Sequence, residues 1–578
     1  MFSLQFPIKT SEKKARYLVN IGIVVDCIHL VALLAFYQYL NNTIVTEFLY
    51  LTIDLHIIWN FYSIVFFVFS IILLSIIAKF SVFYLHRDKY FFKFFSLFYI
   101  LELAICFLVL TENSESLFIG WELLGLSSVL LIAFYEHRPQ VLKNALTILV
   151  IYKLSDVIFY SALIYGAFVG NHSYLQGEGT LTLSFILISC LIKSSIFPII
   201  WLPRAMEGPT PSSAVFYGGL STHLACFIFL SAWSHAAEHN IYLIIIATAL
   251  TLSFSVIASL MSKQTPDIKN AIAYASIAQL GLIYIETLWG YYTFALMHCV
   301  LNGLYRTIEF LKSPSLLYQH HSIEQNRNNR QENERYLIES RFPLRIKQRL
   351  YFFIYHEFIF PRFLISTIQG FLGLHTTSLS TKSLINYFLT TLSFFIIFEI
   401  FIYFLFRIPI SFFDELLFMV AFGFHIIAII HIVNPVRFFI SLSASTLAVF
   451  QVLLQHTFIE IHPISFLYFL LLGYFIMELV ISRFTKHSRE VRDIQSSRSN
   501  FFKICLLAVG ISLVGIPGLL SFIVWENLEH VLLKKAPDII TDGFSIMALN
   551  TILFFRFYFI NYLGSNGDKE VFHLVERE

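Results

Sequence analysis

The sequence predicts an all-α protein that crosses a membrane many times. Of its 578 residues, 57% are apolar and only 13% are Asp, Glu, Lys or Arg, whereas a soluble globular domain carries about 25% charged residues. The apolar residues come in runs of about 20, the length that an α-helix needs to cross the hydrocarbon core. These observations exclude the soluble, fibrous and disordered classes of protein.

The first 312 residues contain a series of apolar segments that we predict to be membrane spans. The segment 17–40 is too long and too bulky for a cleaved signal sequence, so we expect it to be the first span. Basic residues gather in every second loop, which marks those loops and the N-terminus as lying inside. The predicted spans are 17–40, 52–78, 94–111, 117–135, 144–168, 181–202, 212–233, 241–261, 270–287 and 292–311.

A hydrophilic, arginine-rich stretch divides the chain into three parts. We predict an N-terminal membrane half at 1–312, an inside loop with an interfacial helix at 313–382, and a C-terminal membrane half at 383–578. The helix is expected at 350–372, where charged residues and Pro361 interrupt the apolar run. Further spans are expected at 384–407, 412–435, 438–457, 463–482, 501–524 and 543–562. The whole chain is predicted to have about 14–16 transmembrane helices, with both ends inside.

Several charged residues fall inside the predicted spans, where an ionisable side chain indicates a functional site. Lys193 is about ten residues from either end of its span, too deep to reach water easily. Glu122, flanked by Gly120 and Gly125, is the natural partner for a buried lysine. A structural carboxylate that merely holds Lys193, or an interfacial position of Glu122, would account for the same residues without proton transfer.

Other ionisable residues and helix breaks point to the same chemistry. Asp156 stands three residues after Lys153, so the two can form a local ion pair or join a larger relay. Proline-containing breaks follow Lys193 and recur at 515–518, and broken helices are tolerated in membranes where they line an ion path. The remaining charged candidates in apolar runs are Glu102, Arg306, Glu399 and Glu478, together with His298, which is either a carrier or a satisfied core residue. Together these features predict translocation of protons or cations.

Three motifs resemble those of a known family. Residues 201–214 read WLPRAMEGPTPSSA, residues 120–128 read GWELLGLSS, and residues 267–276 read DIKNAIAYAS. The first closely resembles the signature of the chain 5 family of antiporter-like subunits in respiratory NADH:ubiquinone oxidoreductase, or complex I. The good match covers about residues 50–312, and beyond it only the motif at 515–518 stands out.

The resemblance implies a fold of antiporter-like inverted repeats and a role in proton translocation. It implies a subunit at the far end of the membrane arm, in the mitochondrial inner membrane, driven by quinone reduction elsewhere in the complex. Its partners would be other membrane-arm subunits, above all the neighbouring antiporter-like chain. Carried over by motif, Lys193 would carry the proton, Glu122 would tune it, and Asp156 would be an accessory acid. Lys269 also matches, but its position at a loop edge favours a charge at a helix start.

The chain departs from the family pattern in its second half-channel. The family has a histidine where this chain has Tyr217, and a histidine, histidine, lysine series where this chain has His298, Asn302 and Arg306. Arg306 keeps a charge but does not release its proton, and Trp525 stands in place of a further lysine. Either His298, Glu399 or Glu478 substitutes for the missing carriers, or this chain does not complete an independent proton path.

Two other functions remain possible from the residues. A stand-alone or multisubunit cation/proton antiporter would share the fold and the buried lysine and glutamate. A lipid-modifying enzyme with membrane-embedded histidines is disfavoured because the 20 histidines lack a repeated metal-binding spacing. The six cysteines form no CxxC pair, and no glycine-rich nucleotide fingerprint is present. We therefore expect no cofactor in this chain, with NADH, FMN, iron–sulfur clusters and ubiquinone held by other subunits.

Overall fold

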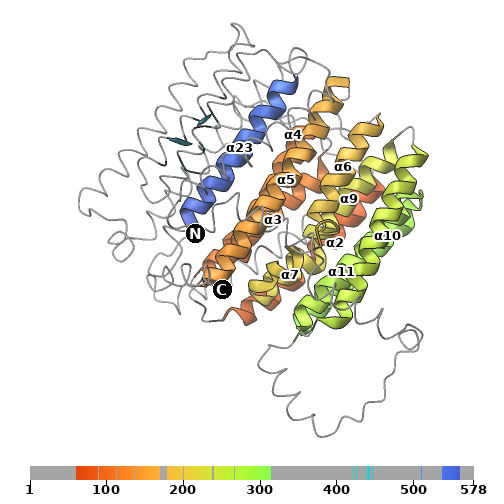
Figure 1. The fold of residues 1–578 in the computed structure, drawn as a ribbon. Helices are drawn as coiled ribbons and strands as arrows, with labels where there is room; N and C mark the ends of the chain where they lie inside the picture. Colours follow the sequence, from red (N-terminus) through yellow and green to blue (C-terminus); the bar gives the residue numbers. More distant parts are fainter. Residues whose placement is uncertain are drawn as a thin grey trace, which may run out of the picture.

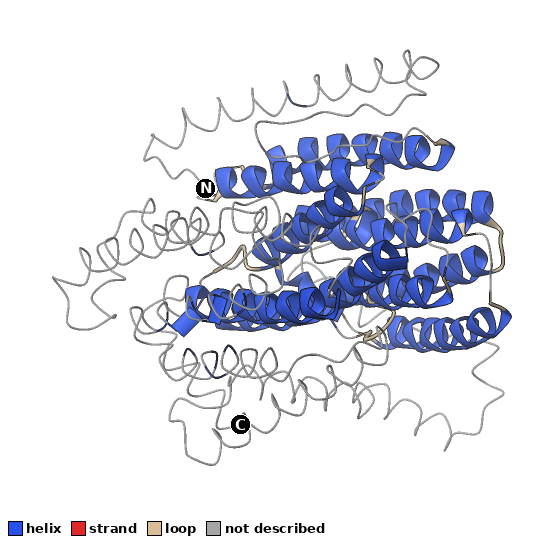
Figure 2. Ribbon diagram, turned by 90° about the horizontal axis from the view of Figure 1, so that it is seen from above, coloured by secondary structure: helices blue, strands red, loops and turns tan. Residues whose placement is uncertain are grey.

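The computed structural model describes residues 60–313, apart from 87, 89, 112, 137, 170–178, 200, 237–239 and 266, and residues 537–559. Single positions outside these ranges are also described, at 22, 421, 423, 425, 428, 438, 441, 442, 445, 446, 449 and 510. Every regular element in the described ranges is helical (Figure 2). The all-α prediction is confirmed for these two ranges. The predicted spans at 17–40, 384–407, 412–435, 438–457, 463–482 and 501–524 lie outside them, as does the predicted loop with its interfacial helix at 313–382 apart from its first residue.

Long helices fill the described N-terminal part, and eight helices in the described residues are apolar and long enough to cross a membrane. Most of the predicted spans from 94 to 311 match an observed helix within a few residues. The elements are α2 (Phe61–Tyr84), α3 (Phe91–Leu110), α4 (Ser114–Ile132), α5 (Pro139–Val169), α6 (Thr180–Lys193), α7 (Trp201–Arg204), η2 (Ala205–Glu207), α8 (Thr210–Ser213), η3 (Ala214–Gly219), α9 (Ser221–His235), α10 (Ile241–Gln264), α11 (Ile268–Leu288), α12 (Tyr292–Lys312) and α23 (Pro537–Tyr558).

Polar caps start four of these helices. The side chains of Asn60 and Asn240 accept hydrogen bonds from the backbone N–H groups of Ser63 at 2.7 Å and Tyr242 at 2.9 Å. Asn113 caps α4 and Asp267 caps α11 in the same way. Each cap satisfies one backbone N–H that the first helical turn leaves without an internal partner. The short polar loops of the sequence therefore set where the apolar helices begin.

The predicted span 181–202 is wrong as one continuous helix. Helix α6 ends at Lys193, turns follow at residues 194–199, and the short α7 begins at Trp201. Pro198 lacks a backbone N–H and restricts the residue before it, so the helix cannot run through this position. The predicted span 212–233 is likewise divided into α8, the π-helical turn η3 and α9. The break predicted after Lys193 is confirmed, and it puts the lysine at a helix end.

Helix α23 joins the far C-terminal part of the chain to the N-terminal helices (Figure 1). It packs along α5, where the ring of Phe544 lies 4.2 Å from that of Tyr160 and 5.3 Å from that of Phe118, measured between centroids. Behind this contact, Trp121 of α4 stacks on Phe159 of α5 at 4.4 Å. These aromatic contacts cover one side of the α4–α5 pair and keep it away from the surface.

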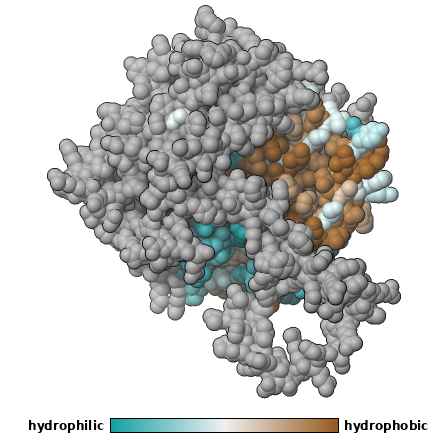
Figure 3. All heavy atoms as spheres, viewed as in Figure 1, coloured by the Kyte–Doolittle hydropathy of each residue, from teal (hydrophilic) through white to brown (hydrophobic). Residues whose placement is uncertain are grey.

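Helix α10 exposes apolar side chains over most of its length, among them Tyr242, Ile246 and Val256. Figure 3 shows an apolar area on the side where Figure 1 places α10 and α11. A soluble protein rarely exposes such a continuous apolar surface. This outer face is the one expected of a helix in contact with lipid, in keeping with a multi-pass membrane protein.

Candidate functional site

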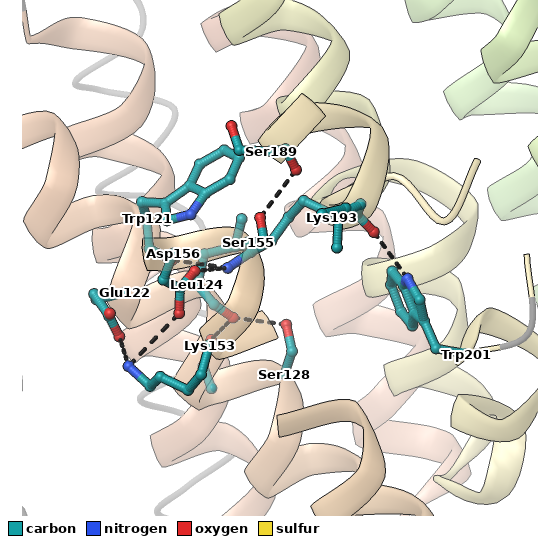
Figure 4. A network of polar contacts seen from close by, with 12 residues as sticks. Trp121, Glu122, Leu124, Ser128, Lys153, Ser155, Asp156, Ser189, Lys193 and Trp201 are labelled. Atoms are coloured by element: carbon teal, nitrogen blue, oxygen red, sulfur yellow. Dashed lines mark hydrogen bonds and ion pairs between the residues drawn. The ribbon is translucent and has the colours of Figure 1, made fainter. Parts of the chain in front are cut away.

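Two acids and two lysines meet between α4, α5 and α6 (Figure 4). Glu122 Oε2 of α4 pairs with Lys153 Nζ of α5 in a short contact. Asp156 of α5 lies between the two lysines, with Oδ2 3.6 Å from Lys153 Nζ and Oδ1 2.9 Å from Lys193 Nζ. The four charges therefore alternate in sign along one line, which we call the buried ion chain: Glu122, Lys153, Asp156 and Lys193.

All four residues of the buried ion chain are buried, and Lys193 has no exposed surface. Burial of an unpaired charge costs several kcal/mol, so each charge needs an opposite one close by. The alternating order places an opposite charge beside every charge, and the two negative and two positive groups give the buried ion chain no net charge. A proton gained or lost at one end changes the balance that the next group meets.

Lys193 is the last residue of α6, and its ammonium group is surrounded by groups of α4 and α5. The backbone carbonyl groups at a helix C-terminus carry a partial negative charge that favours a cation. The ammonium group donates to Trp121 O at 3.4 Å and lies 4.7 Å from the Trp121 ring and 4.5 Å from the Tyr152 ring. Two aromatic faces and one carbonyl therefore surround the ammonium on the sides that Asp156 does not occupy.

Glycine and serine residues bring the three helices close enough for these contacts. A Cβ atom at Gly125 would lie 3.1 Å from Lys193 Nζ, and one at Gly120 would lie 2.8 Å from Phe107 Cβ of α3. Ser155 Oγ donates to Ser189 O at 2.9 Å and ties α5 to α6. The expectation that the two glycines permit close helix approach is confirmed, and Gly125 serves the lysine itself.

The structure brings together Glu122, Asp156 and Lys193, but with different partners from those expected. We expected Glu122 to be the partner of Lys193, whereas Lys153 and Asp156 stand between them. The reason is that Lys153 and Asp156, three residues apart, project from one face of α5 toward both neighbouring helices. The local pair of Lys153 and Asp156 is present, and Asp156 also contacts Lys193 of α6; a relay through these residues stays a prediction.

The face of α12 carries the second group of expected residues. His298 Nδ1 lies 2.8 Å from Glu286 Oε1 and its Nε2 lies 3.1 Å from Gln279 Oε1, both on α11. Arg306 donates from Nη1 to Glu309 Oε2 at 2.5 Å within α12. Neither His298 nor Arg306 makes a contact with the buried ion chain among the interactions of the described residues. Glu102 lies on α3, while Glu399, Glu478, Trp525, residues 515–518 and the side chain of Tyr217 lie outside the described residues.

The turn at Gly208–Pro211 ties the ends of several helices together. Lys269 Nζ, in the first turn of α11, donates to Thr210 Oγ1 at 3.0 Å, and Thr210 Oγ1 lies 3.2 Å from Tyr84 Oη of α2. Asn144 Nδ2 of α5 donates to Glu207 Oε1 at 3.4 Å. Burial raises the pKa of Glu207 above its ordinary value. Lys269 thus has a tying role at a helix start, as its sequence position predicts.

Sequence reasoning missed several buried titratable residues, among them a histidine beside the α12 positions. His223 of α9 has no exposed surface, and its Nε2 lies 3.0 Å from Asn302 Nδ2 of α12. It stands six residues after Tyr217, the position where the resemblance led us to look for a histidine. The sequence feature that could have revealed it is the position of this histidine inside a predicted apolar span. Among the described residues, no group of three His, Cys, Asp or Glu side chains is placed to hold a metal ion.

Part of the chain matches a known family of membrane proteins. Residues 112–335 match a family model described as NADH:quinone oxidoreductase/Mrp antiporter, transmembrane. The resemblance inferred from the motifs is confirmed. The matched region contains the buried ion chain, the Gly208–Pro211 turn, His223 and the three α12 positions.

Curated relatives carry the name NADH-ubiquinone oxidoreductase chain 5. The protein from Aspergillus niger is 29% identical over 321 residues, covering 51% of this chain and 48% of its own length. That from Dugong dugon is 29% identical over 271 residues, covering 45% of this chain and 44% of its own length. The match thus spans about half the length of these relatives. A solved Mrp complex from Dietzia sp. is 19% identical over 53% of this chain and 35% of its own, with a TM-score of 0.45, which is too low to carry an argument.

Proposed function

We propose that this chain is a proton-translocating subunit in the membrane arm of an NADH:ubiquinone oxidoreductase. The observation that carries the proposal is the buried ion chain, in which Lys193 stands at a helix break and pairs with Asp156. The side chain of Lys193 has no exposed surface. The curated relatives named as chain 5 of that enzyme support the same assignment. The site residues we assign are Lys193 as carrier, with Glu122 and Asp156 as the acids that control it.

The geometry suggests how a proton at one end of the chain moves a proton at the other. When Glu122 takes up a proton, it loses its charge and its hold on Lys153. The Lys153 ammonium then pairs more strongly with Asp156, which it already approaches at 3.6 Å. Asp156 in turn holds Lys193 less strongly, and the ammonium of Lys193 releases its proton. One proton enters at Glu122 and one leaves from Lys193 Nζ, so the net charge of the site is unchanged.

The α12 residues have different roles in this proposal. Arg306 remains charged and acts as a fixed charge because guanidinium does not release its proton in proteins. His298 Nδ1 lies 2.8 Å from Glu286 Oε1, and an imidazole is the side chain most often used to pass protons near neutral pH. We assign His298 to proton transfer at the α11–α12 end of the molecule. Nicotinamide, flavin, iron–sulfur and quinone chemistry belongs to other subunits, and this chain contributes the proton path.

The proposed function also implies a membrane and neighbouring subunits for this chain. It is assigned to the mitochondrial inner membrane, beside another antiporter-like subunit of the membrane arm. Quinone reduction elsewhere in the complex would supply the energy. A native gel of mild detergent extracts, stained for NADH dehydrogenase activity, tests the assembly: peptides of this chain are expected in the stained band.

Substitution of Lys193 tests the mechanism. In membranes that hold the whole complex, Lys193→Met removes the ammonium, and Lys193→Arg keeps a charge that does not release its proton. We expect both variants to lose most NADH-driven proton pumping, measured by quenching of a pH-sensitive dye. The matched control is Lys93→Met, because Lys93 pairs with Glu136 at 2.8 Å but is 25% exposed. Pumping at the normal rate in Lys193→Arg would contradict a role in proton release.

A second candidate function is cation/proton exchange in a multisubunit antiporter, because the matching family model covers Mrp antiporters as well. This alternative predicts that the chain migrates apart from NADH dehydrogenase activity. It also predicts that a sodium gradient drives proton movement in vesicles without NADH. Copurification with flavin and iron–sulfur subunits would reject it.

A further inference from the structure

We propose that His223 is a second proton-carrying side chain, positioned by Asn302, in a core where Ser194, Tyr284 and Cys226 provide buried polar groups between the ends of α6 and α9. The inference rests on the proposed function, since it extends the path that begins at the buried ion chain. The chain departs from its family at Tyr217 and Asn302, and the structure reveals a buried imidazole between the helices that carry these two positions.

His223 bridges α9 and α12 in a part of the molecule without water access. Its ring has no exposed surface, and Nδ1 lies 3.3 Å from Thr222 Oγ1 while Nε2 lies 3.0 Å from Asn302 Nδ2. The Cys299 thiol of α12 lies 3.8 Å from the His223 carbonyl oxygen and donates to it. Both ring nitrogens thus have polar neighbours, although most of the surrounding α9 surface is apolar.

Asn302 suits both protonation states of this ring. In the neutral ring, the amide NH₂ of Asn302 donates to Nε2 and the proton sits on Nδ1, facing Thr222. When Nε2 takes up a proton, the amide needs only to rotate by about 180° so that its oxygen accepts from Nε2–H. A residue with a single donor or a single acceptor would satisfy one state only. The pair is therefore built to hold the imidazole and the imidazolium at similar positions.

Three buried polar side chains contact one another in series, and two of them stand close in the sequence to Lys193 and to His223. Ser194 follows Lys193 in the chain, and its Oγ lies 3.3 Å from Tyr284 Oη of α11. Tyr284 hydrogen-bonds Cys226 of α9, which stands one helical turn from His223. Ser194, Tyr284 and Cys226 are all buried. In an otherwise apolar core, hydroxyl and thiol groups in this order provide donors and acceptors along the route.

The proton balance of the step is simple. Lys193 loses one proton and becomes a neutral amine, while His223 gains one and becomes imidazolium. Ser194 Oγ, Tyr284 Oη and Cys226 Sγ can each accept a proton on a lone pair and release their own proton in the same step. The charged groups that act on His223 from α12 are Arg306 and His298, and both are paired with acids, Glu309 and Glu286. These pairings limit the repulsion that a proton on His223 meets.

Substitution by glutamine separates a titrating role from a structural one. Glutamine at His223 can still donate to and accept from Asn302, but it does not take up a proton. We expect His223→Gln to reduce NADH-driven proton pumping at least about tenfold, within the range for loss of an acid–base group. NADH dehydrogenase staining on a native gel checks that the complex still assembles. Pumping near the normal rate in the assembled variant would overturn the inference.

An exchange of the two partners provides the decisive variant. His223→Asn combined with Asn302→His keeps one imidazole and one amide at the same interface, because their nitrogens lie only 3.0 Å apart. We expect this double variant to recover most of the pumping lost in His223→Gln. If His223→Gln does not assemble, the double variant decides alone: assembly with pumping supports the inference, and assembly without it overturns it.

Lys193→Met, measured beside these variants, distinguishes the two proposals. If Lys193→Met pumps normally, the proposed function fails. If Lys193→Met is impaired while His223→Gln is normal, only the role of His223 fails. Tyr284→Phe removes one hydroxyl of this polar series and is expected to reduce pumping less than His223→Gln does, because it leaves in place the imidazole that takes up the proton.

Discussion

The buried ion chain between α4, α5 and α6 differs from the polar group on α9, α11 and α12 in how its charges are balanced. In the first region, two acids and two lysines contact one another across three helices, and all are buried. In the second, each charged residue has its own local partner at a partly exposed site: Arg306 and Glu309 are 11% and 28% exposed. His223 of α9, which contacts Asn302 of α12, has no exposed surface.

This difference explains what each region can do. Charges that share partners, as Asp156 shares two ammonium groups, cannot change singly, so a proton at one end affects the other. Charges in separate pairs change independently, and exposed pairs contribute little to stability. We therefore expect substitutions in the buried ion chain to have large, coupled effects, and substitutions in the Arg306–Glu309 pair of α12 to have small, local ones.

The largest effect is expected for Asp156→Asn. It leaves Lys193 buried beside an amide, and loss of one partner of a buried pair costs about 3–5 kcal/mol. We expect the complex to assemble poorly, measured as the amount in the native gel band. Adding Lys193→Met removes the unpaired charge and should restore assembly without pumping. Glu136→Gln, in a pair that is 25% and 14% exposed, is the control and should assemble normally.

Glu122→Gln is expected to have the next largest effect. The amide does not balance Lys153, so the ammonium competes for Asp156 and the coupling to Lys193 is lost. A hydrogen bond to a charged group contributes about 1.5–3 kcal/mol, so pumping should fall by about tenfold or more. Glu122→Asp keeps the charge on a shorter side chain and should be milder. Equal, normal pumping rates in both variants would remove Glu122 from the mechanism.

Gly125→Ala tests the space reserved for the lysine. The new Cβ would lie 3.1 Å from Lys193 Nζ, so the ammonium must shift by a few tenths of an ångström. We expect a reduction in pumping of about twofold to tenfold with normal assembly, because small displacements in a preorganised site reduce the rate. Gly166→Ala on α5 is the control, since its Cβ would meet Thr182 Cγ2 at an ordinary 3.6 Å.

The smallest effect is expected for Arg306→Gln combined with Glu309→Gln. The pair lies within one helix and is partly exposed, so its removal should change the free energy of unfolding by about 1 kcal/mol or less. Thermal inactivation of NADH-driven pumping should therefore shift by only a few degrees. A loss of pumping as large as that of Lys193→Met would show that the two regions do not differ as we propose.

Much of the fold followed from the sequence because its signals are local. Apolar runs of membrane length gave the positions of α3, α4, α5, α10, α11 and α12 within about five residues, and Asn and Asp caps mark several of their starts. The break after Lys193 was visible from Pro198, but the run of apolar residues to Leu202 concealed where α6 stops. The division of the chain at residue 313 stays a prediction, because the segment that follows α12 lies outside the described residues.

The sequence by itself determined that this chain is a multi-pass helical protein and that Glu122, Asp156 and Lys193 belong to a buried site. Charges in apolar runs are visible in one dimension, since each is unfavourable in a membrane whatever its neighbours. Only the tertiary structure decided which charges are partners. Lys153 lies between Glu122 and Asp156, and His223 lies against Asn302. These contacts depend on how helices that are distant in sequence pack side by side, and no local sequence pattern contains that information.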